Sequence, residues 1–188
     1  VMGCLHQAVA DKAPAEGTSC LWNPALMGGH GLVPDEDFGD ATPFAVGLFH
    51  TGGAGARPHK DGLSATAFPS GVRNTPVEIN ESIAPIVVWK KEYRTDSGGA
   101  GEFRGGTGQV MEIASSENAP FAIAATFDRV HHAPRGREGG LDGFTGKVEL
   151  TSGAVLNNKG TQSIPRGDRL HLEMPGGGGY GDPFQRDP

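Results

Sequence analysis

The sequence has few cysteines that could form disulfide bonds and no long apolar run that could span a membrane. Only two of its 188 residues are cysteines, Cys4 and Cys20, too few for a disulfide framework and spaced like no zinc motif. We therefore expect two buried free thiols. No apolar stretch approaches the roughly 20 residues that cross a bilayer, and the first residues lack the features of a signal peptide. These absences predict a cytoplasmic protein without a membrane partner.

An excess of positive charge and a nucleotide-binding loop are also missing. The 16 Lys and Arg residues are outnumbered by 22 Asp and Glu and form no basic stripe, so nucleic acid is not an expected partner. Gly146-Lys147 is followed by Val148 instead of the Ser or Thr of a phosphate-binding loop, and no G-x-G-x-x-G lies between a strand and a helix. The signatures of serine hydrolases and zinc proteases are absent too.

Glycine and proline are abundant, with 31 and 14 residues, and they follow no collagen-like period. Each glycine inside a helix costs about 1 kcal/mol, so this composition excludes a helical bundle. Short β-branched runs between glycine-rich turns predict an α+β fold that is mostly β. We expect an N-terminal helix, long glycine-rich loops and a C-terminal β-sandwich or barrel, within one compact unit.

The spacing of apolar residues along the sequence predicts where the helix and the strands lie. Apolar residues at helical spacing predict a helix of about a dozen residues that ends before Pro14, and strands are expected at residues 44–50, 86–89, 109–114, 121–127, 147–151 and 169–174. Residues 86–89 are apolar on both faces, which predicts a strand covered on each side. Residues 1–80 form a helix and a loop-rich part, and 81–188 a β-rich part. Because the helix starts without a cap and Val1 precedes the first Met, we expect a fragment or split subunit of a larger protein.

Several polar residues are candidates for chemistry in the irregular stretch from Arg57 to Glu81. Asp61 and Glu78 suit general bases or metal ligands, and Arg57 and Arg73 suit anion clamps. Equally, Asp and Asn can cap turns while Arg makes surface pairs. Weaker metal candidates are His50 and His59, and weaker still the group Asp128, His131 and His132. The glycine-rich loops at 51–55, 97–108 and 175–181 suit anion-binding nests, tight turns or close approach of another chain's backbone.

Three strings, taken in order, resemble the C-terminal part of the hydantoinase B/oxoprolinase family: HTGGAGARPHKDGLSATAFPSGVRNTPVEI at 50–79, YRTDSGGAGEFRGGTGQVMEI at 93–113 and MPGGGGYGDP at 174–183. The resemblance implies part of an ATP-dependent amidohydrolase that opens cyclic amides such as hydantoin, N-methylhydantoin or 5-oxoproline. A hydantoinase A-type partner would bind ATP and Mg and phosphorylate the substrate. Alternatives are a subunit of an acetone- or acetophenone-type carboxylase, and a non-catalytic assembly module.

The resemblance also implies roles for residues inside the matching strings. Asp61 and Glu78 would be catalytic. Substrate would be bound by Arg57, Asn74, Thr75 and, in the Asp-Arg pair, Arg129. The backbone loops would be formed by Gly52, Gly53, Gly55, Gly99, Gly101, Gly105, Gly177 and Gly178. The rest of the B-type component lies outside these motifs, so we expect any divalent metal to be bound there and this chain alone to be inactive.

Overall fold

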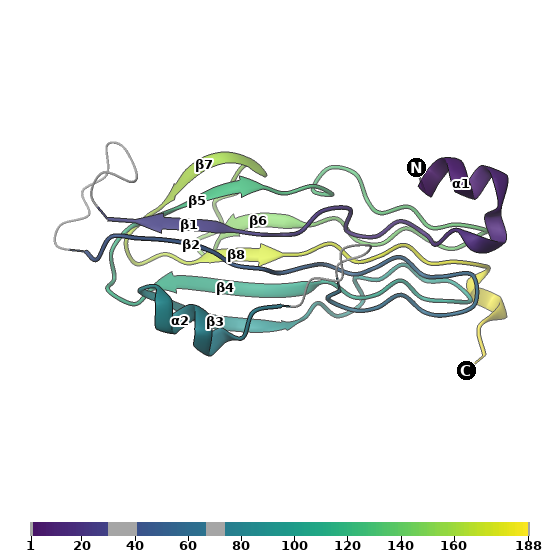
Figure 1. Ribbon diagram of the computed structural model, residues 1–188, viewed down its shortest axis with the longest axis horizontal. Helices are drawn as coiled ribbons and strands as arrows, with labels where there is room; N and C mark the ends of the chain where they lie inside the picture. The colour runs from purple at the N-terminus through teal and green to yellow at the C-terminus, as the bar shows by residue number, and fades with distance from the viewer. Residues whose placement is uncertain (1, 30–40, 67–73, 188) are drawn as a thin grey trace.

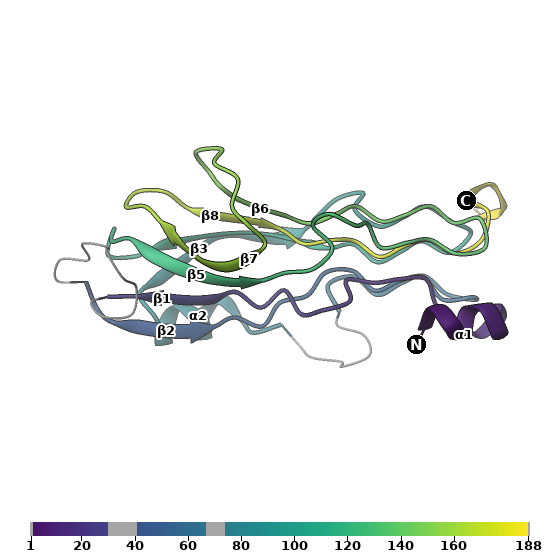
Figure 2. The same ribbon diagram turned by 90° about the horizontal axis from the view of Figure 1, so that it is seen from above.

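Two four-stranded antiparallel sheets pack face to face at one end of the molecule (Figures 1 and 2). This computed structural model describes residues 2–29, 41–66 and 74–187. The first sheet has the order β2-β1-β5-β7 and the second β3-β4-β8-β6. The first comprises β1 (Ala25–Gly28), β2 (Phe44–Gly47), β5 (Phe121–Thr126) and β7 (Lys159–Ile164). The second comprises β3 (Ile86–Tyr93), β4 (Gln109–Ser115), β6 (Lys147–Leu150) and β8 (Leu170–Glu173).

Side chains from both sheets fill the space between them. Ile123 of β5, Ile113 of β4 and Leu172 of β8 are fully buried in one core, and Trp22 stacks on Phe127 with ring centroids 4.5 Å apart. These residues confirm the alternation expected for 121–127 and 169–174, and the mostly-β fold. Since β1 and β2 join β5 in one sheet, residues from both halves of the chain share the sandwich.

Short helices lie at the two ends of the molecule: α1 (Met2–Ala8), η1 (Ala10–Lys12), α2 (Val77–Ile83) and η2 (Pro183–Gln185). The N-terminal helix is shorter than expected, and its apolar residues Leu5 and Val9 are 44% and 39% exposed. Cys4 is exposed as well and Cys20 is half-buried, so the expected burial of both thiols is wrong. In Figure 1, α1 stands beside the end of the molecule instead of within the core.

Two strands and one α-helix were not expected, and one strand differs in its environment. The strand β1 has only four residues, β7 is polar, and α2 begins directly after Pro76; none of them has a periodicity long enough to be recognised. The strand β3 was expected to be covered on both faces, but Trp89 is 59% exposed. The apolar run there reflects one covered face and one face on which Arg169 lies over the Trp89 ring.

The other end of the molecule is a bundle of extended, glycine-rich segments that continue the strands of the sandwich (Figure 1). We call it the glycine bundle; its segments are residues 13–18, 51–57, 61–66, 97–108, 134–144 and 175–181. Along the last segment, the N–H groups three residues apart donate to the same neighbour. These bonds run from Gly176 and Gly179 to Phe144 and Leu141, and from Gly177 and Tyr180 to Gly106 and Phe103. A repeat of three residues is that of a polyproline-II-like chain.

This three-fold arrangement explains the glycine content. A Cβ on Gly177 would meet the carbonyl of Ala54, and one on Gly53 would meet the carbonyl of Gly106. Each side of such a segment faces another backbone, so there is room for the hydrogen atom of glycine but not for a side chain. Backbones thus approach one another closely, but they are segments of this one chain, whereas the sequence analysis expected the backbone of another chain.

Candidate functional site

The residues singled out from the sequence lie in three separate places. His50, Asn74, Thr75 and Glu78 lie where the sandwich meets the glycine bundle. Arg57, His59 and Asp61 lie near the C-terminal residues, and Arg129 lines a pocket. Arg73 lies outside the described residues. In Figure 1 the helix that carries Glu78, α2, lies beside the sandwich, whereas the C-terminus lies at the tip of the glycine bundle, so Asp61 and Glu78 are not brought together.

A polar cluster, which we call the junction site, forms around Gln109, the first residue of β4. The Gln109 side-chain nitrogen donates to the Thr51 carbonyl (2.8 Å) and to Asn74 Oδ1 (3.0 Å). Asn74 Nδ2 in turn donates to the Ala65 carbonyl (3.0 Å). Both the oxygen and the nitrogen of the Asn74 side chain are therefore hydrogen-bonded within the protein. Asn74 is thus suited to positioning the loops of the site.

His50 is the least accessible member of the junction site. Its side chain is fully buried, and neither ring nitrogen has a hydrogen-bond partner in the described part of the chain. Burial, together with the charge of Lys91, lowers the pKa of His50 to about 4, and the neighbouring Asn74 offsets part of that shift. The imidazole is consequently neutral at pH 7. Thr51 Oγ1 is also buried and unpartnered among these residues. Unsatisfied buried groups are rare and frequently mark a functional site.

Charged groups complete the junction site. Lys91 Nζ donates to the Thr75 carbonyl (2.8 Å), and its pKa is lowered by burial while the charge of Glu78 acts in the opposite direction. Glu78 itself is exposed in the first turn of α2. The exposed carboxylate of Glu78 and the half-buried ammonium of Lys91, whose charges interact, can exchange protons and hold a polar substrate. Lys91 and Gln109 were missed from the sequence; only the position of Gln109 inside a matching string pointed to it.

Asp61 has a different environment. Its carboxylate accepts from Arg186 Nη1 (2.8 Å), Arg186 Nη2 (2.9 Å) and the Arg104 N–H (2.8 Å), while Arg57 donates to its carbonyl. The hydrogen bond from Arg186 is the main reason why the pKa of Asp61 is lowered. These contacts tie the C-terminal residues to the tip of the glycine bundle. They match the alternative in which Asp and Arg make turns and surface pairs.

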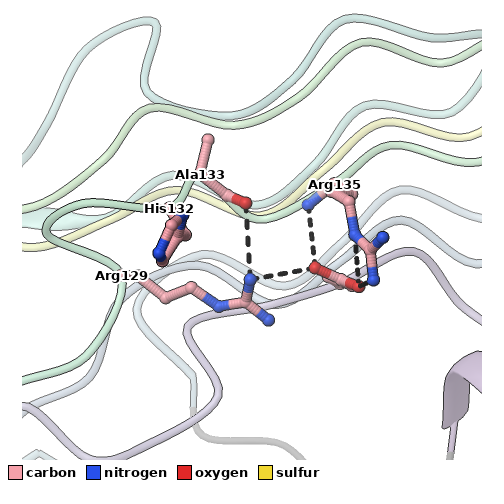
Figure 3. Close-up of a pocket in the computed structure, with 5 residues that line it drawn as sticks. Arg129, His132, Ala133 and Arg135 are labelled. Carbon is pink, nitrogen blue, oxygen red and sulfur yellow. Dashed lines mark hydrogen bonds and ion pairs between the residues drawn. The ribbon is translucent and has the colours of Figure 1, made fainter.

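The third place is a cavity of about 340 Å³ lined by Glu16, Arg129, His132, Ala133 and Arg135 (Figure 3). The Glu16 carboxylate accepts from Arg129 Nη1 (2.9 Å), from Arg135 Nε (2.9 Å) and Nη2 (2.7 Å), and from Arg137 Nη2 (3.1 Å). Burial would raise the pKa of Glu16, but the bonds from Arg135 and the charge of Arg129 outweigh it and lower the pKa to about 2. Three guanidinium groups around one carboxylate leave a surplus of positive charge. The pocket therefore suits an anionic group.

The predicted loop glycines all belong to the glycine bundle. The N–H groups of Gly53, Gly99, Gly177 and Gly178 donate to carbonyls of neighbouring segments, and that of Gly105 donates to Gly99 within its own segment. These five glycines build a scaffold, because their donors are already used and cannot serve as a nest for an anion. As for the weak metal candidates, His59 is exposed whereas His50 is buried, and Asp128 pairs with Lys159 (2.8 Å).

Comparison with known proteins identifies the family. The family model described as hydantoinase B/oxoprolinase matches residues 1–183. The chain belongs to the hydantoinase B/oxoprolinase family. A 5-oxoprolinase from Dictyostelium discoideum is 34% identical over 84% of this chain. A putative B subunit of a D-/L-hydantoinase from Pseudomonas sp. (strain NS671) is 33% identical over 73% of it. The resemblance seen in the sequence is thereby confirmed.

Solved structures of related proteins have the same fold. An ATP-dependent caprolactamase from Pseudomonas jessenii matches 97% of this chain with a TM-score of 0.71 and 25% identity. An acetone carboxylase, at 21% identity and a TM-score of 0.66, shares the fold. The chain spans 13% of the oxoprolinase, 24% of the hydantoinase component and 32% of the caprolactamase chain. No helix in the described ranges is long and apolar enough to cross a membrane.

Proposed function

We propose that this chain is the C-terminal part of a B-type component of an ATP-dependent enzyme that hydrolyses a cyclic amide such as hydantoin, N-methylhydantoin or 5-oxoproline. The match to an ATP-dependent caprolactamase along 97% of the chain carries this proposal, because that protein's name describes a hydrolase of a cyclic amide. The relatives named as a 5-oxoprolinase and as a hydantoinase component support the same reaction class. The acetone carboxylase shares the fold only.

In this proposal ATP and Mg²⁺ are bound by a hydantoinase A-type partner, and the remainder of the B-type component completes the active site. The glycine bundle supports this assignment of nucleotide binding to the partner, since the N–H groups of Gly53, Gly99, Gly105, Gly177 and Gly178 already donate to carbonyls of the bundle. Activation by phosphorylation is chemically reasonable, because a phosphoryl group on the amide oxygen makes the amide carbon more electrophilic toward water. After water adds, the ring C–N bond would break with a proton taken up by the nitrogen, and hydrolysis of the resulting acyl phosphate would release phosphate.

The junction site is the better candidate for chemistry within this chain. Glu78 is exposed and free to orient a water, whereas the oxygens of Asp61 already accept three hydrogen bonds. Asn74 and Gln109 position the loops around the neutral His50. Arg129, with Arg135, offers positive charge for an anionic group at its own, separate pocket.

The test uses the assembled enzyme: this chain, the rest of the B-type component and the A-type partner. ATP-dependent ring opening is measured with the three substrates named above. We expect Glu78→Gln to lower turnover by about 100-fold with ATP binding intact, as the loss of a general base does. Asp61→Asn should act mainly through stability. Glu92→Gln, an exposed glutamate on β3, is the matched control.

Three other outcomes would contradict parts of the proposal. Unchanged turnover per assembled complex in Glu78→Gln would favour the non-catalytic assembly module. Bicarbonate-dependent ATP hydrolysis with a ketone substrate would favour the carboxylase branch. Ring opening by this chain alone would remove the need for the A-type partner.

A further inference from the structure

A row of ionisable side chains crosses the outer face of the second sheet, away from the junction site. His171 of β8 is the direct cross-strand partner of Glu112 on β4 and of Glu149 on β6. Glu173, two residues further along β8, lies on the same face because side chains alternate along a strand. The intervening Leu170 and Leu172 are fully buried in the core. The register of three strands thus brings one imidazole and three carboxylates together.

Three of these groups converge on one point. His171 Nε2 lies 3.5 Å from Glu173 Oε1 and 4.0 Å from Glu149 Oε1. One ligand atom of each residue lies within 4.8 Å of the other two. A tetrahedral Zn²⁺ with bonds of about 2.0–2.1 Å places its ligands about 3.3 Å apart. Small side-chain rotations would therefore close these three atoms around an ion.

The remaining contacts orient the donors toward that point. Glu112 Oε1 lies 3.3 Å from His171 Nδ1, so a proton on Nδ1 leaves the Nε2 lone pair directed at Glu149 and Glu173. A carboxylate behind a metal-binding histidine is the usual outer partner of such sites. The ion pair of Arg94 Nη2 with Glu173 Oε2 (2.6 Å) leaves Oε1 of that carboxylate facing the histidine.

The charges around the site are compatible with a cation. Among the ion pairs of the described residues, Glu149 has no Lys or Arg partner; its carboxylate faces only His171. Arg169 lies 3.6 Å from Glu112, on the far side of the imidazole from Nε2. Two positive charges compete with an ion for Glu173: Arg94, which pairs with Oε2, and Lys147, whose Nζ lies 3.9 Å from Oε1. The Lys147 side chain is 57% exposed and can turn into solvent.

We propose that His171, Glu149 and Glu173 bind a divalent transition-metal ion, with Zn²⁺ as the best match to one imidazole and two carboxylates. The ion would bridge β6 and β8 and keep at least one coordination position open to water, as three-ligand sites do. Glu112 is a positioning residue that acts through His171. The site is distinct from the junction site and from the pocket at Arg129.

The test is a calorimetric titration of the full chain, stripped of metal with EDTA, with Zn²⁺. We expect one Zn²⁺ bound per chain at this site, with Kd raised at least about 100-fold in His171→Gln and in Glu149→Gln. Glu112→Gln should raise Kd by about 10- to 100-fold, the usual effect of losing the outer carboxylate. A salt-bridge network without a metal would show no such graded series. Glu92→Gln and the double variant His131→Gln/His132→Gln should bind as the unaltered chain does.

Co²⁺ gives a second, spectroscopic measurement. Bound at this site with low coordination number, it should show visible d–d absorption that disappears in His171→Gln and shifts in Glu112→Gln. Zn²⁺ binding that is equal in the unaltered chain, His171→Gln and Glu149→Gln would overturn the proposal. If His171→Gln does not fold, Glu149→Gln decides, since its side chain is 28% exposed and its loss leaves the core intact.

Discussion

The β-sandwich and the glycine bundle are continuous in the chain, yet they are held together in opposite ways. In the sandwich, apolar side chains such as Ile123 and Leu172 are fully buried between two sheets. In the glycine bundle, backbone packs on backbone, and consecutive N–H groups donate to different neighbouring segments. Side-chain burial stabilises the first region, whereas hydrogen bonding and close van der Waals contact stabilise the second.

This difference sets how each region responds to substitution. Ordering a glycine costs more backbone entropy than ordering any other residue, by roughly 0.5–1 kcal/mol relative to alanine. The bundle therefore depends on the sandwich, whose strands run directly into its segments: Gly108 precedes β4, and Pro175 lies just beyond the end of β8. A region packed by backbone has no side-chain freedom with which to absorb an added atom. We expect it to be the less tolerant of the two.

The largest effect should come from a single added methyl group in the bundle. In Gly177→Ala the new Cβ would meet the Ala54 carbonyl and the Gly55 N–H, which belong to packed backbone and cannot rotate away. We expect loss of the folded state, measured as loss of a cooperative thermal transition by circular dichroism. Gly47→Ala, on the edge strand β2 with nothing within 4 Å of its Cβ, is the control and should change stability by less than about 1 kcal/mol. Equal stability of the two variants would contradict backbone packing.

A cavity in the sandwich should have an intermediate effect. Leu172→Ala removes a fully buried side chain from the core and should lower the free energy of unfolding by about 3 kcal/mol, as such truncations do. Urea denaturation measures this change. Val155→Ala, at a side chain that is 81% exposed, should shift the free energy of unfolding by less than about 0.5 kcal/mol. If Val155→Ala lowered the free energy of unfolding more than Leu172→Ala does, the assignment of Leu172 to the core would be contradicted.

The smallest effect should be electrostatic and should depend on pH. The pKa of Glu16 is about 2 in the folded chain against 4.5 for a free glutamate, so its stabilisation is complete above pH 4.5 and is lost as pH falls toward 2. Glu16→Gln should therefore lower the free energy of unfolding by about 2 kcal/mol at pH 7, with the difference shrinking below pH 4.5. Denaturation at several pH values measures it, with Glu92→Gln as the control. A difference that stays constant down to pH 2 would show that Glu16 acts by packing alone.

Only some residues of the candidate site could be predicted from the sequence. The strings that contain Asn74, Thr75 and Glu78 led to the junction site, but Lys91 lies on a strand whose sequence shows no sign of a site. Asp61 and Glu78 looked equivalent as carboxylates in a polar stretch, and the structure gives them unrelated environments. Separation along the chain says little about distance here, because residues 61–66 run from the tip of the glycine bundle toward the sandwich, beside which α2 lies.

The family, the mostly-β class and the strands other than β1 and β7 follow from the sequence, because motif order and short apolar or alternating runs are local properties of the chain. The glycine content can be counted in the sequence, but the structural reason for it cannot be predicted from the sequence. Only the tertiary structure decided that the glycine-rich loops form a scaffold, that β1 and β7 are strands, and that His171 meets Glu149 and Glu173. Those features depend on contacts between residues far apart in the sequence, which local propensity does not encode.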